Sequence, residues 1–234
     1  MAVRPRLTEG SKPAQSFLGQ LDTARHLADK TARRSTRTRL ALLEAAQELF
    51  ATRSIEGVSV DDIARAADVA KGSLYNHFES KEALADALFG MVRGHVAQLL
   101  DAAIDKSTPP PERLISGAFV ILRFAIDHPE SVAALIKLSP QLLDEQAPLN
   151  VIARETIVEG LATGHFKGIP PDSATMLVIG AMVVMLQDSI DRKKSVKRLI
   201  ARITPLMAGV LKALGVDGEN AAAAAKAAAR ANLE

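Results

Sequence analysis

Cysteine is absent from the 234-residue chain, and aromatic side chains are scarce. Without cysteine, a disulfide-stapled secreted domain, a thiolate zinc site, an iron–sulfur cluster and a cysteine nucleophile are all excluded. Only 3% of the residues are aromatic, with no Trp and one Tyr, whereas 48% are hydrophobic and Ala and Leu are abundant. Because strands favour aromatic and β-branched residues and helices favour Ala and Leu, the composition predicts an all-α fold.

The chain also lacks a hydrophobic run long enough to cross a bilayer. Its longest uncharged apolar run, residues 174–186, is about half of what a membrane span needs. The N-terminus lacks the short basic stretch followed by an apolar segment that marks a secretory signal. We therefore expect a soluble, cytoplasmic protein that does not associate with a membrane.

Charge is distributed unevenly along the chain, although the formal net charge is only +2. Residues 1–39 hold nine Lys or Arg against three acids, which leaves a net charge of −4 for the rest. A basic end suggests a polyanionic partner such as nucleic acid, but a solvated charged tail fits the charge alone equally well. Residues 1–35 are poor in apolar side chains and contain two Pro and two Gly, so we expect them to form a flexible basic arm.

Helical periodicity begins after the arm, in residues 36–52, and continues through most of the chain. A long apolar pattern to about residue 105 is followed by Pro109 to Pro111, which predict a break. Five further helices are expected over residues 112–127, 130–138, 149–162, 172–191 and 195–214. The Ala-rich tail, residues 217–234, has strong helix propensity but short side chains, so it is expected to be a frayed or docked terminal helix.

Residues 59–78 have the spacing of a helix-turn-helix motif. Ser59 and Asp62 form an [ST]-x-x-[DE] capping pattern that predicts a helix start. Ala64 would allow the two helices to approach closely, and Leu74 would face back from the second helix. This arrangement exposes the start of the second helix, although helical hairpins that bind no nucleic acid are also common. The exposed residues would be Lys71, Gly72, Ser73 and Tyr75.

Residues 36–84 carry motifs of a known family: AAQELF before a turn, SVDDIA at the start of the next helix, and KGSLYNHF followed by SKEAL. This stretch resembles the N-terminal DNA-binding domain of tetracycline-repressor (TetR) family regulators, without a gap. The resemblance implies a three-helix helix-turn-helix domain over residues 36–80, joined to a helical ligand-binding and dimerisation domain over residues 81–216. The second domain matches the family in layout only.

Carried over by position, the resemblance implies that residues on the recognition helix and its flanks contact phosphates or base edges. Ammonium, hydroxyl and backbone N–H groups suit this role, and a glycine allows close backbone approach. The chain departs from the family pattern at Asp68, where glycine is usual, and at Ala70, where serine would cap the helix. His77 could instead cap or pack. The predicted DNA-binding residues are Arg37, Ser59, Lys71, Gly72, Ser73, Tyr75, His77 and Lys81.

The apolar helix over residues 172–191 has two alternative interpretations. Met176, Met182 and Met185 could line an apolar ligand pocket, because flexible thioethers fit irregular ligands. More often such a stripe is core or interface. Gly180 permits close helix contact, and the family resemblance implies that this helix and the one over residues 195–214 form a four-helix bundle with a second copy.

Features of an enzyme are missing from the sequence. The five His residues show no metal-ligand spacing, and no nucleophile elbow, phosphate-binding Gly-rich loop or dinucleotide fingerprint occurs. We expect no catalytic residue, metal or cofactor. The sequence thus favours a homodimeric transcriptional regulator, a repressor released from palindromic double-stranded operator DNA by a small-molecule effector. The alternative is a helical DNA-scaffolding or protein-interaction module without sequence-specific regulation.

Overall fold

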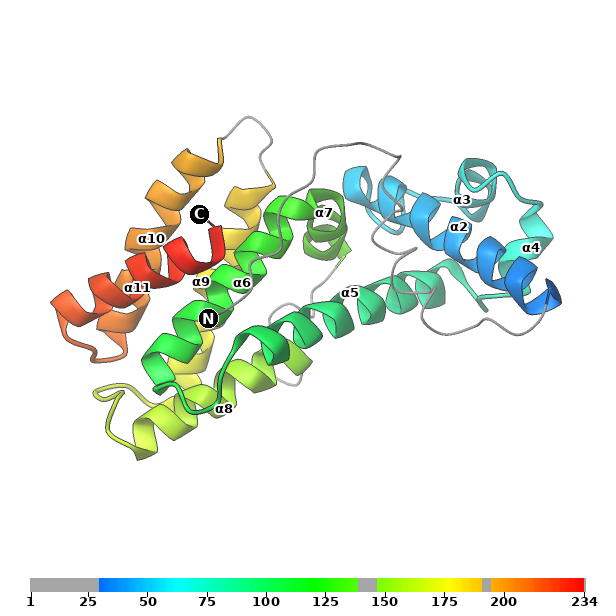
Figure 1. Ribbon diagram of the computed structural model, residues 1–234. Helices are drawn as coiled ribbons and strands as arrows, with labels where there is room; N and C mark the ends of the chain where they lie inside the picture. Colours follow the sequence, from blue (N-terminus) through cyan, green and yellow to red (C-terminus); the bar gives the residue numbers. More distant parts are fainter. Residues whose placement is uncertain (1–29, 139–146, 191–194, 234) are drawn as a thin grey trace.

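The computed structural model describes residues 30–138, 147–190 and 195–233, and these ranges contain ten helices and no strand (Figure 1). The predicted all-α fold is therefore confirmed. The helices are α2 (Lys30–Thr52), α3 (Val60–Ala66), α4 (Lys71–Tyr75), α5 (Lys81–Ala103), α6 (Pro110–Asp127), α7 (Pro129–Leu138), α8 (Pro148–Ala162), α9 (Pro171–Ser189), α10 (Val196–Ala213) and α11 (Gly218–Leu233).

Helices α2, α3 and α4 form a head at one end of the molecule (Figure 1). Fully buried Leu42, Phe50, Ile63 and Leu74 hold its core together. Helix α2 begins at Lys30, so residues 30–35 are helical and do not belong to the flexible arm that was expected over residues 1–35. Ala and Arg favour helix, and adding residues to an existing helix costs no new nucleation. Residues 1–29 lie outside the described part of the chain.

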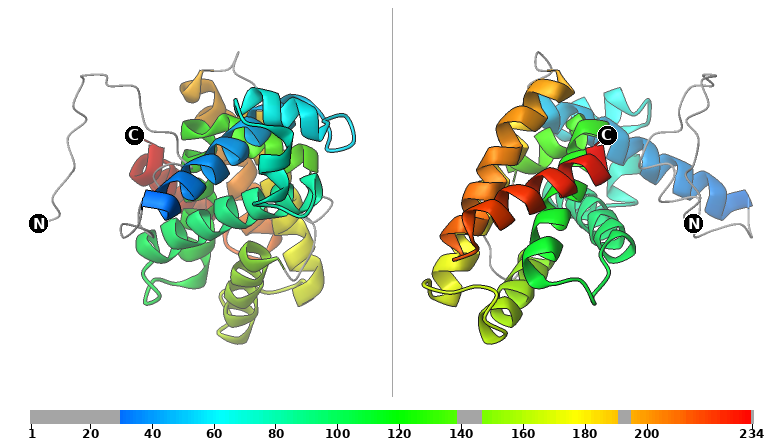
Figure 2. Two further views of the ribbon diagram at one scale, coloured as in Figure 1. Left: turned by 90° about the vertical axis from the view of Figure 1, so that its right-hand side faces the viewer. Right: turned by 60° about the vertical axis from the view of Figure 1, so that its left-hand side comes forward.

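Helix α5 leads from the head into a body formed by α6 and α8 to α11 (Figure 1). Two further views show α11 lying against α10 and α6 (Figure 2). Of the two possibilities for the Ala-rich tail, the structure has the docked helix. Ala221, Ala225 and Ala228 are buried because their small methyl groups let α11 approach its neighbours closely. Asp217 accepts hydrogen bonds from the N–H groups of Glu219 and Asn220 and so caps this helix.

The core of the head continues past the predicted boundary at residue 80. The same apolar cluster includes Leu88 and Val96 of α5, Phe124 of α6 and Val132 of α7. Helix α7 packs against α2 and also touches α9. Head and body are thus joined by shared hydrophobic packing on two sides, through α5 and through α7.

Proline and glycine mark the helix ends where the sequence predicted breaks. Prolines occupy the first positions of α6, α8 and α9, where a missing N–H costs nothing. Gly164, the predicted stop of α8, has a φ of 78° that favours glycine. Within the described ranges, no helix combines the length and apolar character needed to span a membrane.

Candidate functional site

The helix-turn-helix begins at Ser59, which caps α3 as predicted. The Ser59 hydroxyl accepts a hydrogen bond from the N–H of Asp62 at 3.1 Å, and the Asp62 carboxylate accepts one from the N–H of Ser59 at 3.2 Å. Bonds from the Ser59 hydroxyl and N–H lower the pKa of Asp62. This reciprocal pair satisfies N–H groups that the first turn leaves without partners, so the start of α3 is fixed while Ser59 remains exposed.

The turn between α3 and α4 is held by backbone hydrogen bonds. The N–H of Val69 donates to the carbonyl of Ala64 at 3.0 Å, and the N–H of Asp68 donates to that of Arg65 at 3.2 Å. This is the Schellman pattern, which places a left-handed residue just after the helix. Asp68 takes that place with a φ of 52°. The turn is therefore formed with aspartate where glycine is usual, because aspartate tolerates this conformation better than most residues.

Helix α4 presents polar residues to solvent because Leu74 anchors its opposite side. Leu74 is fully buried, whereas Lys71, Gly72 and Tyr75 are exposed and Ser73 is half-buried. The Tyr75 side chain is 54% exposed. No neighbouring group lies within 4 Å of where a Cβ on Gly72 would sit. The exposed face of α4 is thus open to a large partner.

The ammonium group of Lys71 forms an ion pair with Asp61 of α3. Its Nζ lies 3.0 Å from one carboxylate oxygen and 3.2 Å from the other. The hydrogen bond and charge of Asp61 raise the pKa of Lys71. Both side chains are more than half exposed, so the pair contributes little free energy and can open. Ala70, just before α4, provides no side-chain cap, as expected where serine is replaced.

Arg37 and His77, two further predicted DNA-binding residues, differ in exposure. Arg37 is exposed on α2, whose N-terminal end lies near α4 (Figure 1). His77 is half-buried, and burial followed by the charge of Arg39 lowers its pKa. The Arg39 guanidinium sits 5.0 Å from the centre of the Phe78 ring, a cation–π distance. The structure thus leaves Arg37 accessible, whereas His77 is half-buried next to Phe78 in the chain.

The ammonium group of Lys81 is hydrogen-bonded within the head. Its Nζ donates hydrogen bonds to the carbonyls of Ile55 and Val58 at 2.8 Å and 3.0 Å, and the side chain is half-buried. These bonds tie the start of α5 to the loop between α2 and α3. Two of the three ammonium protons are thereby committed within the head, and the contact of Lys81 with DNA stays a prediction.

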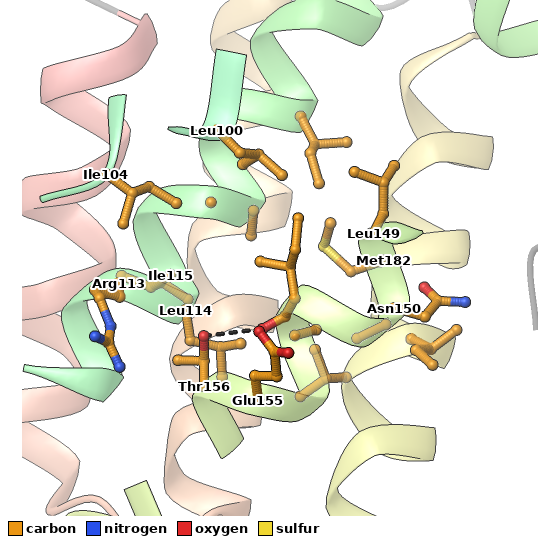
Figure 3. A pocket seen from close by; sticks show the side chains of 18 of the residues that line it. Leu100, Ile104, Arg113, Leu114, Ile115, Leu149, Asn150, Glu155, Thr156 and Met182 are labelled. Carbon is orange, nitrogen blue, oxygen red and sulfur yellow. Dashed lines mark hydrogen bonds between the residues drawn. The ribbon is translucent and has the colours of Figure 1, made fainter. Parts of the chain in front are cut away.

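A partly open cavity of about 410 Å³ lies between α5, α6, α8, α9 and α10. Figure 3 shows lining side chains from α5, α6, α8 and α9, among them Leu100, Ile115, Thr156 and Met182. Most of the lining is hydrocarbon, including Leu100 of α5, Ile104 just after that helix and Ile152 of α8. This size and polarity are typical of small-molecule sites. The polar and charged lining residues are Asp101, Lys106, Arg113, Asn150, Glu155, Thr156 and Glu159.

Arg113 is the buried charge of this cavity wall. Its side chain is 9% exposed and forms an ion pair with Glu159 of α8. Nη1 donates to the carbonyl of Lys106 at 2.9 Å, whereas Nε is enclosed without a hydrogen-bond partner among the described residues. A buried cation needs such partners to offset its lost hydration. Arg113 therefore joins α6, α8 and the loop before α6 at one end of the cavity.

The three methionines proposed for the pocket lie in three different environments. Met182 lines the cavity (Figure 3), whereas Met176 is 68% exposed and Met185 is fully buried in the core. At about 100° per residue, Met176 and Met182 point about 120° apart around α9. The expectation of a pocket lined by all three is thus corrected, and Met182 is the one that remains.

Sequence reasoning missed the residues whose roles depend on pairing across the fold. Asp61 and Lys71 are ten residues apart, and Arg113 and Glu159 are 46 apart. One signal was available for Arg113, since it shares a helical face with the apolar residues Val120 and Phe124 of α6. Among the described residues, no three His, Asp or Glu side chains come together as metal ligands.

A helix-turn-helix with an exposed second helix, joined to a helical body, is typical of a class of DNA-binding regulators. The sequence profile described as "Bacterial regulatory proteins, tetR family" matches residues 42–88. The transcriptional repressor KstR2 of Mycobacterium tuberculosis is 31% identical over 150 residues, which cover 59% of this chain and 74% of KstR2. The chain belongs to the TetR family of helix-turn-helix transcriptional regulators. Membership in this family of regulators agrees with the prediction that the chain is not an enzyme.

Solved structures share the fold. A regulatory protein of the tetR family from Rhodococcus RHA1 has a TM-score of 0.63 and 22% identity, covering 77% of this chain and 98% of its own. RolR in complex with resorcinol has a TM-score of 0.54 and 22% identity, covering 83% of this chain and 95% of its own. Both structural matches extend over the head and the body. The body, whose sequence resembled the family in layout only, therefore shares the fold of these proteins.

Proposed function

We propose that this DNA-binding regulator is a homodimeric repressor that binds a palindromic operator and is released by a small molecule in the body cavity. The main support for the proposal is the exposed polar face of α4, which faces solvent because Leu74 on the opposite side of the helix is buried. A helix of this kind enters the major groove, and a two-fold symmetric dimer presents two of them about 34 Å apart.

The DNA interface proposed here combines α4 with its flanks. Lys71, released from Asp61, would pair with a phosphate, and Tyr75 would donate its hydroxyl to a phosphate or base edge. Gly72 and Ser73 allow close backbone approach, while Arg37 and Ser59 contact phosphates on either side. His77 contributes at the edge of the interface. Lys81 acts indirectly, because its bonds to the loop carbonyls position the start of α3.

Dimerisation is proposed through α9 and α10. Met176, Leu177 and Val184 of α9 are exposed although they are large and apolar, and Gly180 lies on the same helix with open space beside it. A row of exposed apolar side chains on one helix is typical of a buried interface in an assembly. Val196 at the start of α10 extends the exposed apolar surface.

An effector in the cavity is supported by its size, its hydrocarbon lining and its position between α5 and the body. RolR, a structural relative, has been solved with resorcinol bound, so small hydroxylated aromatics are reasonable first compounds. The effector would favour a body conformation in which the two heads no longer fit adjacent half-sites. Its differential affinity for the two conformations then sets how strongly it releases DNA.

Operator selection from random-sequence duplexes, followed by fluorescence anisotropy at two salt concentrations, tests the DNA-binding part. A palindromic site bound about 10³-fold or more tightly than scrambled DNA supports a specific regulator. Lys71→Gln should weaken binding to all sequences and reduce the salt slope by about 1. Lys226→Gln on α11 is the matched control and should change neither quantity.

Equal, steeply salt-dependent binding to every duplex would instead favour the DNA-scaffolding alternative. The dimer is tested separately by analytical ultracentrifugation. Val184→Lys should shift the protein towards monomer. Val158→Lys should not, although Val158 is also an exposed valine, on α8. A wild-type monomer at micromolar concentration would contradict the dimer proposal.

A further inference from the structure

The polar groups of the cavity differ from its hydrocarbon in where they lie. In Figure 3, Arg113, Glu155, Thr156 and Asn150 lie in the lower half of the view together with the apolar Leu114 and Ile115, whereas Leu100 and Ile104 lie above them. A ligand that fills the cavity therefore meets hydrocarbon along most of its length and polar atoms along one side. The chemistry of those polar atoms decides which ligand group can be placed there.

The charges that line the cavity do not favour an anion. Three carboxylates, Asp101, Glu155 and Glu159, stand against two cations, Lys106 and Arg113. The buried cation, Arg113, already holds the Glu159 carboxylate and the Lys106 carbonyl. Its Nε, which has no hydrogen-bond partner among the described residues, is enclosed by protein atoms, so a ligand in the cavity does not reach it. An anionic ligand would lose its hydration and find no unpaired buried cation.

Thr156 offers the opposite chemistry, a hydrogen-bond acceptor. Its hydroxyl donates to the carbonyl of Ile152 at 3.0 Å, one turn earlier in α8 (Figure 3). A threonine hydroxyl has one proton and two lone pairs, so with the proton committed Oγ1 can only accept. Glu155, its neighbour at the same wall, has a carboxylate that also only accepts when ionised. The lining thus presents acceptors to a ligand that carries a donor.

We propose that the effector is an uncharged, largely apolar molecule with a hydroxyl donor, which hydrogen-bonds to Thr156 Oγ1, and that Glu155 repels carboxylate analogues. This inference rests on the proposed function in that the cavity is the effector site. The binding preference itself is a property of the cavity and can be measured without DNA.

Three probes of one shape separate the possible chemistries: 4-butylphenol, 4-butylanisole and 4-butylbenzoate. At neutral pH the phenol is uncharged, because phenolic groups have a pKa of about 10, whereas the benzoate is ionised. The anisole keeps an oxygen acceptor but has no donor. Isothermal titration calorimetry on the full-length protein without DNA should give the order phenol, anisole, benzoate, with about tenfold between successive affinities.

Two substitutions assign the preference to residues. Thr156→Val removes the acceptor and should reduce the phenol-to-anisole ratio of affinities to near one. Thr163→Val is the matched control, because Thr163 makes the same hydroxyl bond to the carbonyl four residues earlier, at 2.8 Å, but lies outside the cavity. Glu155→Gln keeps an acceptor oxygen and removes the charge, so it should strengthen benzoate binding several-fold and leave the phenol-to-anisole ratio unchanged.

The inference is overturned if the benzoate binds most tightly, if phenol and anisole bind equally, or if none of the three binds at millimolar concentration. Thermal unfolding of each variant establishes that it is folded. Release of operator DNA is measured separately by anisotropy with the same probes. If the protein binds the phenol selectively but DNA is not released, the proposed function is contradicted and the proposed ligand class is supported. If the probes release DNA but bind without selectivity, the proposed ligand class is contradicted and the proposed function is supported.

Discussion

Gly160 of α8 packs directly against the ring of Phe166. A Cβ added to Gly160 would lie 2.2 Å from Cδ2 and 2.5 Å from Cε2 of the Phe166 ring. The ring cannot move away easily, because Phe166 is 1% exposed and its N–H donates to the Gly160 carbonyl at 2.9 Å. Gly160→Ala must therefore displace a buried ring by more than 1 Å, and overpacking of this kind costs about 1–3 kcal/mol.

Gly94→Ala is the matched control, since Gly94 also lies inside a helix but has open space where its Cβ would be. Alanine there should stabilise the protein by about 0.5–1 kcal/mol through helix propensity. Thermal unfolding at fixed protein concentration should then show opposite shifts, a decrease of several degrees for Gly160→Ala and a smaller increase for Gly94→Ala. A Gly160→Ala variant as stable as Gly94→Ala would refute the proposed contact.

Other perturbations test the head and the junction. Asp68→Val should destabilise by about 1–2 kcal/mol in urea unfolding, whereas Asp68→Gly should not destabilise, because only glycine takes a φ of 52° freely. Ser59→Ala should cost about 0.5–2 kcal/mol by the same assay, since the capping box is lost; no loss would show that the cap is not formed. Burial lowers the pKa of His95 and His128, so the unfolded chain binds more protons than the folded one. Stability should therefore be full above about pH 6.5 and fall as the pH decreases through that value, and His128→Gln should reduce the fall.

The sequence was most informative where local chemistry decides structure. Ser59 and Asp62 satisfy each other within one helical turn, so their spacing alone predicts the start of α3. Leu74 was recognisable as the buried residue of α4 from helical periodicity. Helices α6 to α10 likewise lie within a few residues of the expected ranges, since prolines and glycines mark their ends.

Features that depend on tertiary contact could not be predicted in the same way. The cavity wall is formed by five helices, so no segment contains its pattern. Lys81 looked like a DNA ligand from its position, but only the fold shows that the carbonyls of Ile55 and Val58 surround its ammonium group. Methionine composition suggested a pocket without telling which side of α9 faces it.

Helix α5 has one half in the core of the head and its last turns at the cavity. Its 23 residues make a rod about 34 Å long. A rigid rod converts a small rotation at one end into a larger displacement at the other, and a tilt of about 5° over this length moves its far end by about 3 Å. In a dimer each head would move in this way, so the change in separation between recognition helices would be twice that of one subunit. A ligand no larger than a few side chains can thereby alter the distance between the two recognition helices. To bind both half-sites, that distance must match a whole number of DNA helical turns.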